Sequence, residues 1–320
     1  MTVADMIPIS LATLSGSTSV GLDLCLRSAE DDQLTLYRRS DIPMEAEDLE
    51  RLRSRGVKQL FIRHSDRAQY QAYLRTIADT AFSTKHCHQP GAVTAAVNEV
   101  VLDVLQSAFA SGNDDHLIES ANELGTLTAK LITSDGFAAG DLLNVLRHDY
   151  ATFTHSANVA FYCGLLAAET GFSSDEIQKI VVGGLLHDLG KLDIAEKILC
   201  KPGRLSEWEF RTIAMHPTIG FRRLARRSDL TAHQLLMAYQ HHERPDGQGY
   251  PTGCVAEDID PWAKICSVVD VFEALTSFRP YRSTMSRKRA IEIMAAERGA
   301  AFDPELLSCW IRIIQNCSAS

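Results

Sequence analysis

Two acidic residues of this chain stand where the neighbouring residues are apolar. Asp270 lies within the run 265–272, and Asp188 follows His187 at the end of the run 180–186. An unpaired buried carboxylate costs several kcal/mol, so such a group coordinates a metal, pairs with a cation or takes up a proton. Any fold that buries these segments must therefore bring partners to both carboxylates.

Most of the chain after residue 91 repeats apolar residues at helical spacing. The length of 320 residues corresponds to about two domains, and 45% of the residues are apolar, as in globular proteins. Ser206 with Glu209 is a capping box, and Ser173 or Ser174 caps the helix that carries Glu176. Helices are predicted over 92–110, 114–133, 141–169, 174–187, 206–214, 217–226, 231–242, 261–276, 286–298 and 303–316.

The first 80 residues predict a small α/β unit. Strands are expected at 20–26, 33–37 and 59–63, and helices at 46–55 and around 70–77. The polar stretch 83–91, with Pro and Gly, is the best boundary. We therefore expect a mainly α chain in three parts: an α/β regulatory or docking module at 1–82, a helical linker at 92–138 and a helical catalytic domain at 139–320.

Composition argues against several classes of protein. The longest apolar run, 161–168, is far shorter than a membrane-spanning helix, and no Lys or Arg precedes the apolar residues of 1–10 as in a secretory signal. The net charge of −9 argues against DNA binding. The eight cysteines are scattered as reduced thiols are. These features predict a cytoplasmic protein without a membrane segment.

Five histidines lie on or near the ends of predicted helices, Asp188 directly follows one of them, and Asp270 lies within the apolar helix 262–275. Each alone has an ordinary explanation, a hydrogen-bonded core histidine or a capping aspartate. Together they favour divalent metals, since imidazole and carboxylate suit iron, manganese, zinc or nickel. Seven ligands exceed one tetrahedral ion but suit two ions that share a carboxylate. The predicted ligands are His155, His187, Asp188, His216, His241, His242 and Asp270.

Two motifs in this set carry a resemblance to a known family. Residues 187–191 read His-Asp-Leu-Gly-Lys, and residues 241–251 read His-His-Glu-Arg-Pro-Asp-Gly-Gln-Gly-Tyr-Pro. Together they resemble the HD-GYP subfamily of HD metal-dependent phosphohydrolases, over roughly 140–300. The resemblance implies an HD-type helical bundle that hydrolyses the bacterial second messenger cyclic di-GMP to linear pGpG, and in some members on to GMP, by attack of a metal-activated hydroxide.

The same resemblance implies the role of each ligand. The seven residues named above would hold two divalent ions, iron or manganese first and zinc, nickel or cobalt as alternatives, with Asp188 as the bridge. Some members bind a third ion through a Glu four residues before the first His, where this chain has Ala151. This departure favours two metals and argues against the second step to GMP.

Four residues are expected to contact the substrate. Lys191 can neutralise a phosphate oxygen or the leaving group, which makes it catalytic together with Asp188. Arg279 and Arg282 offer a fork for the second phosphate, and Tyr281 offers a ring for guanine. The alternative for the two arginines is a pair of surface salt bridges at a helix end.

The loop at Gly249-Tyr250-Pro251 has two interpretations. It holds His241 and His242 in place and shapes the pocket wall, and Gly247 and Gly249 permit positive φ. By resemblance, it docks a diguanylate-cyclase-type partner. A homodimer through the helical linker is also expected. Two other functions remain open: a catalytically silent nucleotide-sensing or scaffold module, and a phosphodiesterase for another cyclic dinucleotide such as cyclic GMP-AMP.

Overall fold

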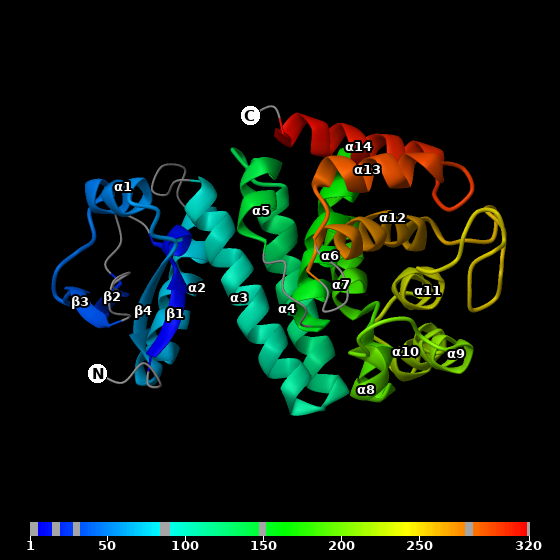
Figure 1. The fold of residues 1–320 in the computed structure, drawn as a ribbon, viewed down its shortest axis with the longest axis horizontal. Coiled ribbons are helices and arrows are strands. Elements are labelled where there is room, and N and C mark those ends of the chain that lie inside the picture. Colours follow the sequence, from blue (N-terminus) through cyan, green and yellow to red (C-terminus); the bar gives the residue numbers. More distant parts are fainter. Residues whose placement is uncertain are drawn as a thin grey trace. The chain divides into compact units, whose positions relative to one another are not determined.

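The structure is a computed structural model that describes residues 6–14, 20–27, 33–83, 90–146, 152–278 and 284–318. It divides into two compact units, the first made of Met1–Asp103 with Ser134–Val145 and the second of Val104–Thr133 with Leu146–Ser320. The ribbon in Figure 1 follows the sequence in colour, from the blue strands of the first unit to the red C-terminal helix of the second. The chain is mainly helical with a small N-terminal sheet, as the sequence predicts.

The first unit is built on a four-stranded antiparallel sheet in the order β1-β4-β2-β3. Leu60 and Ile62 of β4 are fully buried, as are Leu74 and Ile77 of α2, so these elements share the core of this unit. The tyrosine hydroxyl of Tyr70 lies 2.6 Å from Thr13 Oγ1. The elements are β1 (Met6–Ser10), β2 (Leu24–Arg27), β3 (Leu34–Arg38), α1 (Ala46–Ser54), β4 (Gln59–Arg63) and α2 (Arg67–Ser83), with short 3-10 turns at Leu11–Thr13 and His64–Asp66.

Strand β1 was not expected from the sequence. It contains Pro8, which cannot donate to a sheet and is therefore confined to edge strands or bulges. In the structure β1 is an edge strand that pairs only with β4, among the described residues, with Pro8 opposite Phe61. The expected strand at 20–26 is also shorter and begins at Leu24.

Helix α3 (Pro90–Ser111) carries the chain out of the first unit. Its segment Val93–Ser111 has the length and mean composition of a membrane span, although Asn98, Glu99 and Asp103 interrupt its apolar residues. However, 61% of that window is buried inside the structure, as in the core helix of a soluble protein. One such helix is weak evidence for a membrane.

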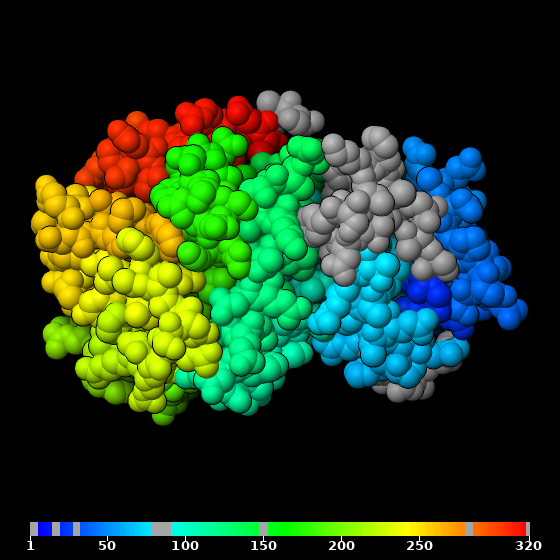
Figure 2. Space-filling view, turned by 180° about the vertical axis from the view of Figure 1, so that it is seen from behind, coloured from blue at the N-terminus to red at the C-terminus, as the bar shows by residue number. Residues whose placement is uncertain are grey.

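The second unit is a bundle of helices around α6, α7 and α12. Gly184 of α7 lies so close to α6 that an added Cβ would stand 2.8 Å from Ala160 Cα. In Figure 2 the green segments of this unit adjoin teal residues on one side and yellow and orange ones on the other. Its helices are α4 (Asp114–Ile132), α6 (Thr152–Glu169), α7 (Ser174–Leu186), η4 (Leu189–Asp193), α8 (Glu196–Leu199), α9 (Glu207–Ile213), α10 (His216–Leu224), α11 (Ala232–Gln240), α12 (Pro261–Thr276), α13 (Arg287–Ala296) and α14 (Pro304–Ser318).

Three large aromatic side chains fill the centre of this bundle. Tyr162 of α6, Phe272 of α12 and Trp310 of α14 are fully buried, and their ring centroids are 5.2–5.8 Å apart in edge-to-face contacts. Such pairs add about 0.5–1.5 kcal/mol each beyond burial. They fix the helices that carry two predicted ligands, one on α6 and one on α12.

Serine and threonine caps set where three helices of the site begin. Ser173, Ser206 and Thr231 each form a capping box at the starts of α7, α9 and α11.

The expected single helix 141–169 is wrong, since α5 (Ala139–Val145) ends well before α6 begins at Thr152. The short helices η4 and α8 were also not expected.

Candidate metal centre

The seven predicted ligands come from helix ends and one helix interior in the second unit. His187 and His241 are the C-caps that directly follow α7 and α11, Asp188 is the N-cap before η4, and His216 is the first residue of α10. The remaining three lie on α6, directly after α11 and on α12: His155, His242 and Asp270. The structure brings all seven together.

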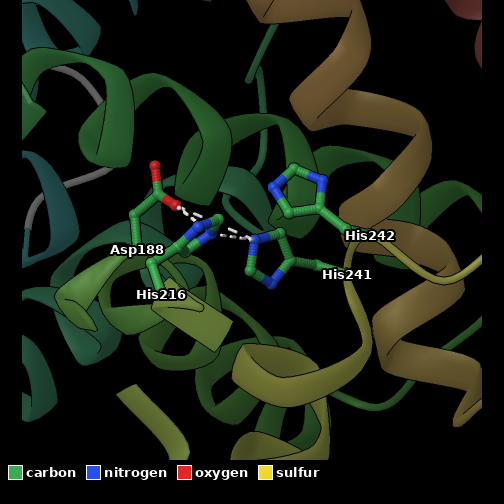
Figure 3. Close-up of side chains that lie close together, drawn as sticks. All are labelled: Asp188, His216, His241 and His242. Atoms are coloured by element: carbon green, nitrogen blue, oxygen red, sulfur yellow. Dashed lines mark hydrogen bonds and ion pairs between the residues drawn. The ribbon is translucent and has the colours of Figure 1, made fainter. Parts of the chain in front are cut away.

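Six of the seven residues form two groups that share one carboxylate. In each group every residue offers a ligand atom within 4.8 Å of the others. One group, drawn in Figure 3, points its side chains toward a common centre. The two groups are Asp188 with His216, His241 and His242, and Asp188 with His155 and His187. Asp188 therefore stands between two sets of imidazoles.

The contact between His216 and His241 indicates that the first group needs a positively charged partner between its nitrogen atoms. His216 donates Nδ1–H to Ile213 O at 2.7 Å, and His241 donates Nδ1–H to Ala238 O at 3.0 Å. Each Nε2 then carries a lone pair, and the two Nε2 atoms lie 3.2 Å apart. Two facing lone pairs repel each other unless a cation or proton lies between them. This donor set fits a metal ion.

The second group shows the same feature. His187 donates Nδ1–H to Gly184 O at 2.7 Å, which directs its Nε2 toward Asp188 Oδ2, 3.3 Å away. That Nε2, His155 Nε2 and Asp188 Oδ1 are buried and have no hydrogen-bond partner among the described residues. Buried polar atoms without a partner are rare in proteins. A metal ion held by this group would satisfy the two Nε2 atoms, and one held by His216 and His241, whose Nε2 atoms lie 3.2 Å and 3.7 Å from Asp188 Oδ1, would satisfy that oxygen.

Asp270 joins the second group from α12. Its Oδ1 lies 3.1 Å from His155 Nε2, and its Oδ2 lies 4.0 Å from His242 Nδ1. Asp188 Oδ2 lies 3.3 Å from Nε2 of both His155 and His187. The Asp270 carboxylate thus lies between one imidazole of each group.

The electrostatics of the centre favour cations. Burial disfavours the charged carboxylate of Asp188, but the charges of His187 and Lys191 hold its pKa well below the usual range. Burial likewise opposes the imidazolium of His155, yet the Glu273 carboxylate raises the pKa of His155 well above its usual value. Negative groups that stabilise a proton at this place also stabilise a metal cation.

His241 and His242 remain neutral in this environment. Burial lowers the pKa of His242 to about 3. Burial likewise lowers the pKa of His241 well below its usual value. Neutral imidazole is the form that binds metals.

Glu273 supports His155, although the sequence reasoning did not single it out. Its Oε2 accepts from His155 Nδ1 at 2.5 Å, and its Oε1 accepts from Asn158 Nδ2 at 3.1 Å and from Ser277 Oγ at 2.5 Å. The carboxylate is buried, and the His155 charge outweighs burial to lower its pKa to about 2. A second acid one turn after Asp270 in the same apolar helix was the signal that could have revealed it.

Glu243 is a second support that was missed. It is the acid of the His-His-Glu motif and is only 1% exposed. Its Oε1 accepts from Thr252 N and Oγ1, both at 2.6 Å, and its Oε2 accepts from Gly253 N at 3.0 Å. These bonds fasten the loop after the histidine pair to the residue next to His242.

Glycines permit close backbone approaches around the centre. A Cβ at Gly190 would stand 2.0 Å from His216 O, so η4 packs directly on the start of α10. Gly247 has the expected positive φ of 74°. Gly249 does not use the positive φ that glycine permits; its constraint is space, since a Cβ there would stand 2.4 Å from Arg244 N and 2.5 Å from Glu243 Cα.

The predicted substrate contacts are described only in part. Lys191 places Nζ 2.6 Å from Asp188 Oδ2, and its side chain is 21% exposed. It therefore connects the buried carboxylate with the surface. Arg279, Tyr281 and Arg282 lie outside the described residues, as does Ala151.

Known proteins share both the sequence and the fold of this region. An HD domain family model matches residues 142–306, about half of the chain. The chain is 38% identical over 165 residues to the cyclic di-GMP phosphodiesterase response regulator RpfG of Xanthomonas campestris, covering 51% of this chain and 44% of that protein. It is 41% identical over 149 residues to 3'3'-cGAMP-specific phosphodiesterase 1 of Vibrio cholerae, covering 46% and 34%.

A solved structure extends the likeness in fold. Bd1817, an HDG"Y"P protein from Bdellovibrio bacteriovorus, has a TM-score of 0.69 and 20% identity, and the match covers 97% of this chain and 100% of that one. The chain spans less than half the length of the two curated relatives above. It belongs to the HD domain family, in the HD-GYP branch.

Proposed function

We propose that this chain is a metal-dependent phosphodiesterase that hydrolyses cyclic di-GMP to linear pGpG. The observation that carries the proposal is the pair of facing Nε2 lone pairs on His216 and His241 beside the shared carboxylate of Asp188. Relatives named as cyclic di-GMP phosphodiesterases in Xanthomonas and Thermotoga support the substrate class.

We propose two divalent ions, with Asp188 as the bridging ligand. Two overlapping donor groups that share this carboxylate support the number. Nitrogen and carboxylate donors without thiolate favour iron or manganese, with zinc, nickel or cobalt as alternatives. When bound, such ions activate water and screen phosphate charge.

The protein's own residues would then position the phosphodiester. Lys191, which spans from Asp188 to the surface, directs a fixed positive charge toward a phosphate oxygen or the leaving group. Water adds to phosphorus, the bond from phosphorus to the 3′ oxygen breaks, and that oxygen takes up a proton. Arg279, Tyr281 and Arg282 remain our proposal for the second phosphate and a guanine.

Other parts of the proposal concern the location of the protein, the roles of its N-terminal segments and its partners. We propose a cytoplasmic location, a regulatory or docking role for the module at 1–82, and a homodimer through the linker at 92–138. The loop at Gly249-Tyr250-Pro251 is our candidate for contact with a diguanylate-cyclase-type partner. The net charge of −9 supports the absence of DNA binding.

The test is anaerobic loading with Mn(II) or Fe(II), addition of cyclic di-GMP and chromatography of the products. We expect pGpG from the intact protein, no product from Asp188→Asn, and full activity from Asp193→Asn, a matched change at an exposed aspartate five residues further on. Metal content, measured by mass spectrometry, should fall only in Asp188→Asn. A metal-loaded protein that makes no product would refute the enzyme and favour a nucleotide-sensing module.

The substrate needs a separate comparison, because relatives are named for two cyclic dinucleotides. Rates on cyclic di-GMP and 3'3'-cGAMP should be measured side by side at equal metal loading. We expect a higher kcat/KM for cyclic di-GMP. The reverse order would assign the chain to cyclic GMP-AMP, while product that proceeds to GMP would contradict the argument from Ala151.

A further inference from the structure

Helix α9 presents two large aromatic side chains to solvent beside the metal centre. Phe210 is 51% exposed and Trp208 is 67% exposed. The helix itself is firmly held, since Ser206 caps its start and Lys201 Nζ lies 2.6 Å and 2.8 Å from the two carboxylate oxygens of Glu209. An exposed ring on an anchored helix is a rigid surface.

Only Phe210 of these two rings has an aromatic contact, within the part of the chain that the structure describes, that leads toward the centre. Its ring lies edge to face with Tyr250, with centroids 6.1 Å apart. The Tyr250 ring in turn lies 4.7 Å from the ring of the predicted ligand His242, at an interplanar angle of 32°. Two successive ring contacts therefore connect an exposed aromatic with the metal centre.

The exposure of the ligands indicates the side from which a substrate enters. His187 and His216 are fully buried, whereas the side chains of His242 and Lys191 are each 21% exposed. A phosphate must reach the centre on the side of these two residues. That is the side on which Tyr250 covers His242 and Phe210 adjoins Tyr250.

A cyclic dinucleotide of this kind carries two purine bases and two phosphates, and each phosphate links two nucleosides. Bases stack on exposed aromatic rings through their π faces, and such stacking is worth about 1–3 kcal/mol per base. We propose that Phe210, supported edge-on by Tyr250, forms the platform on which one purine base of the substrate stacks while its phosphate lies at the metal centre. This inference rests on the proposed function and adds a specificity residue to it.

The experiment compares Phe210→Ala, Phe210→Trp and the matched control Trp208→Ala on cyclic di-GMP. Loss of one stacked base predicts a rise in KM of about tenfold for Phe210→Ala, with kcat within about twofold. Phe210→Trp should restore KM, since a larger ring still stacks. Trp208→Ala should keep the KM of the original protein. Thermal midpoints and metal content should be equal in all four proteins.

Several outcomes would overturn the platform. An unchanged KM in Phe210→Ala, an equal rise in Trp208→Ala, or a fall in kcat alone would each contradict base stacking at Phe210. An unchanged KM together with loss of a protein partner would assign the ring to docking instead. If the original protein itself does not hydrolyse or bind a cyclic dinucleotide, the proposed function fails first, and the platform with it.

Discussion

The substitution Glu273→Gln tests whether the buried acid on α12 tunes the metal centre through His155. The change keeps the size of the side chain but removes its charge. In the structure the carboxylate accepts three hydrogen bonds, from His155, Asn158 and Ser277. An amide can accept at only one of its two ends, so one donor loses its acceptor or His155 must move its proton to Nε2.

The size of the effect follows from these contacts. A hydrogen bond to a charged group contributes about 1.5–3 kcal/mol and a neutral one about 0.5–1.5 kcal/mol. The difference of roughly 1–2 kcal/mol corresponds to a factor of about ten in a binding constant. Loss of outer partners of metal ligands typically weakens binding about 10–100-fold. We expect metal binding at the group with His155 to weaken by this factor.

The assay is a competition titration with a chelating dye and Mn(II), followed by metal analysis. The matched control is Glu292→Gln, which removes an exposed acid of α13 that pairs with Arg289. The control should bind metal like the original protein. Metal affinity in Glu273→Gln within about twofold of the original would refute the reasoning, because the carboxylate would then contribute only to packing.

Three further changes test the loop, a helix cap and a surface ion pair. Gly249→Ala should lower the thermal midpoint and the metal content, because its Cβ would meet backbone at 2.4 Å, whereas Gly140→Ala, with nothing within 4 Å, should change neither. Ser173→Ala should lower the free energy of unfolding by about 1 kcal/mol in urea titrations, by loss of the cap of α7; a change near zero would show that the cap is not needed. The hydrogen bond from Lys201 lowers the pKa of Glu209 from 4.5 to about 2, so its contribution to stability is present above pH 4.5 and lost as pH falls toward 2. The stability difference between Glu209→Gln and the original protein should shrink over that window, and a constant difference would contradict the ion pair.

Much of the secondary structure could be predicted from the sequence because its signals are local. Strand β4 has the predicted bounds, and α12 begins and ends where apolar spacing and Pro261 indicate. The elements that were predicted wrongly have local causes too. Proline is rare in strands, and β1 tolerates Pro8 because it is an edge strand; the sequence between α5 and α6 carries no Gly or Pro near 146–151.

The sequence by itself determined the chemical types at the centre. Histidines and aspartates within apolar segments need partners, and this energetic argument holds for any fold that buries them. It identified Asp188 and Asp270 as carboxylates whose buried charge needs a metal, a cation or a proton as partner. The order and spacing of the motifs then indicated the HD-GYP family before any geometry was known.

Only the tertiary structure decided which atoms converge and what holds them. The direction of each Nε2 depends on where its own Nδ1 finds a carbonyl or carboxylate, and for His155 that acceptor is Glu273, 118 residues away. Gly249 owes its constraint to the backbone of Glu243, not to its own φ. Close approaches of this kind depend on the packing of distant segments, whereas residue type and helical spacing are written in the chain itself.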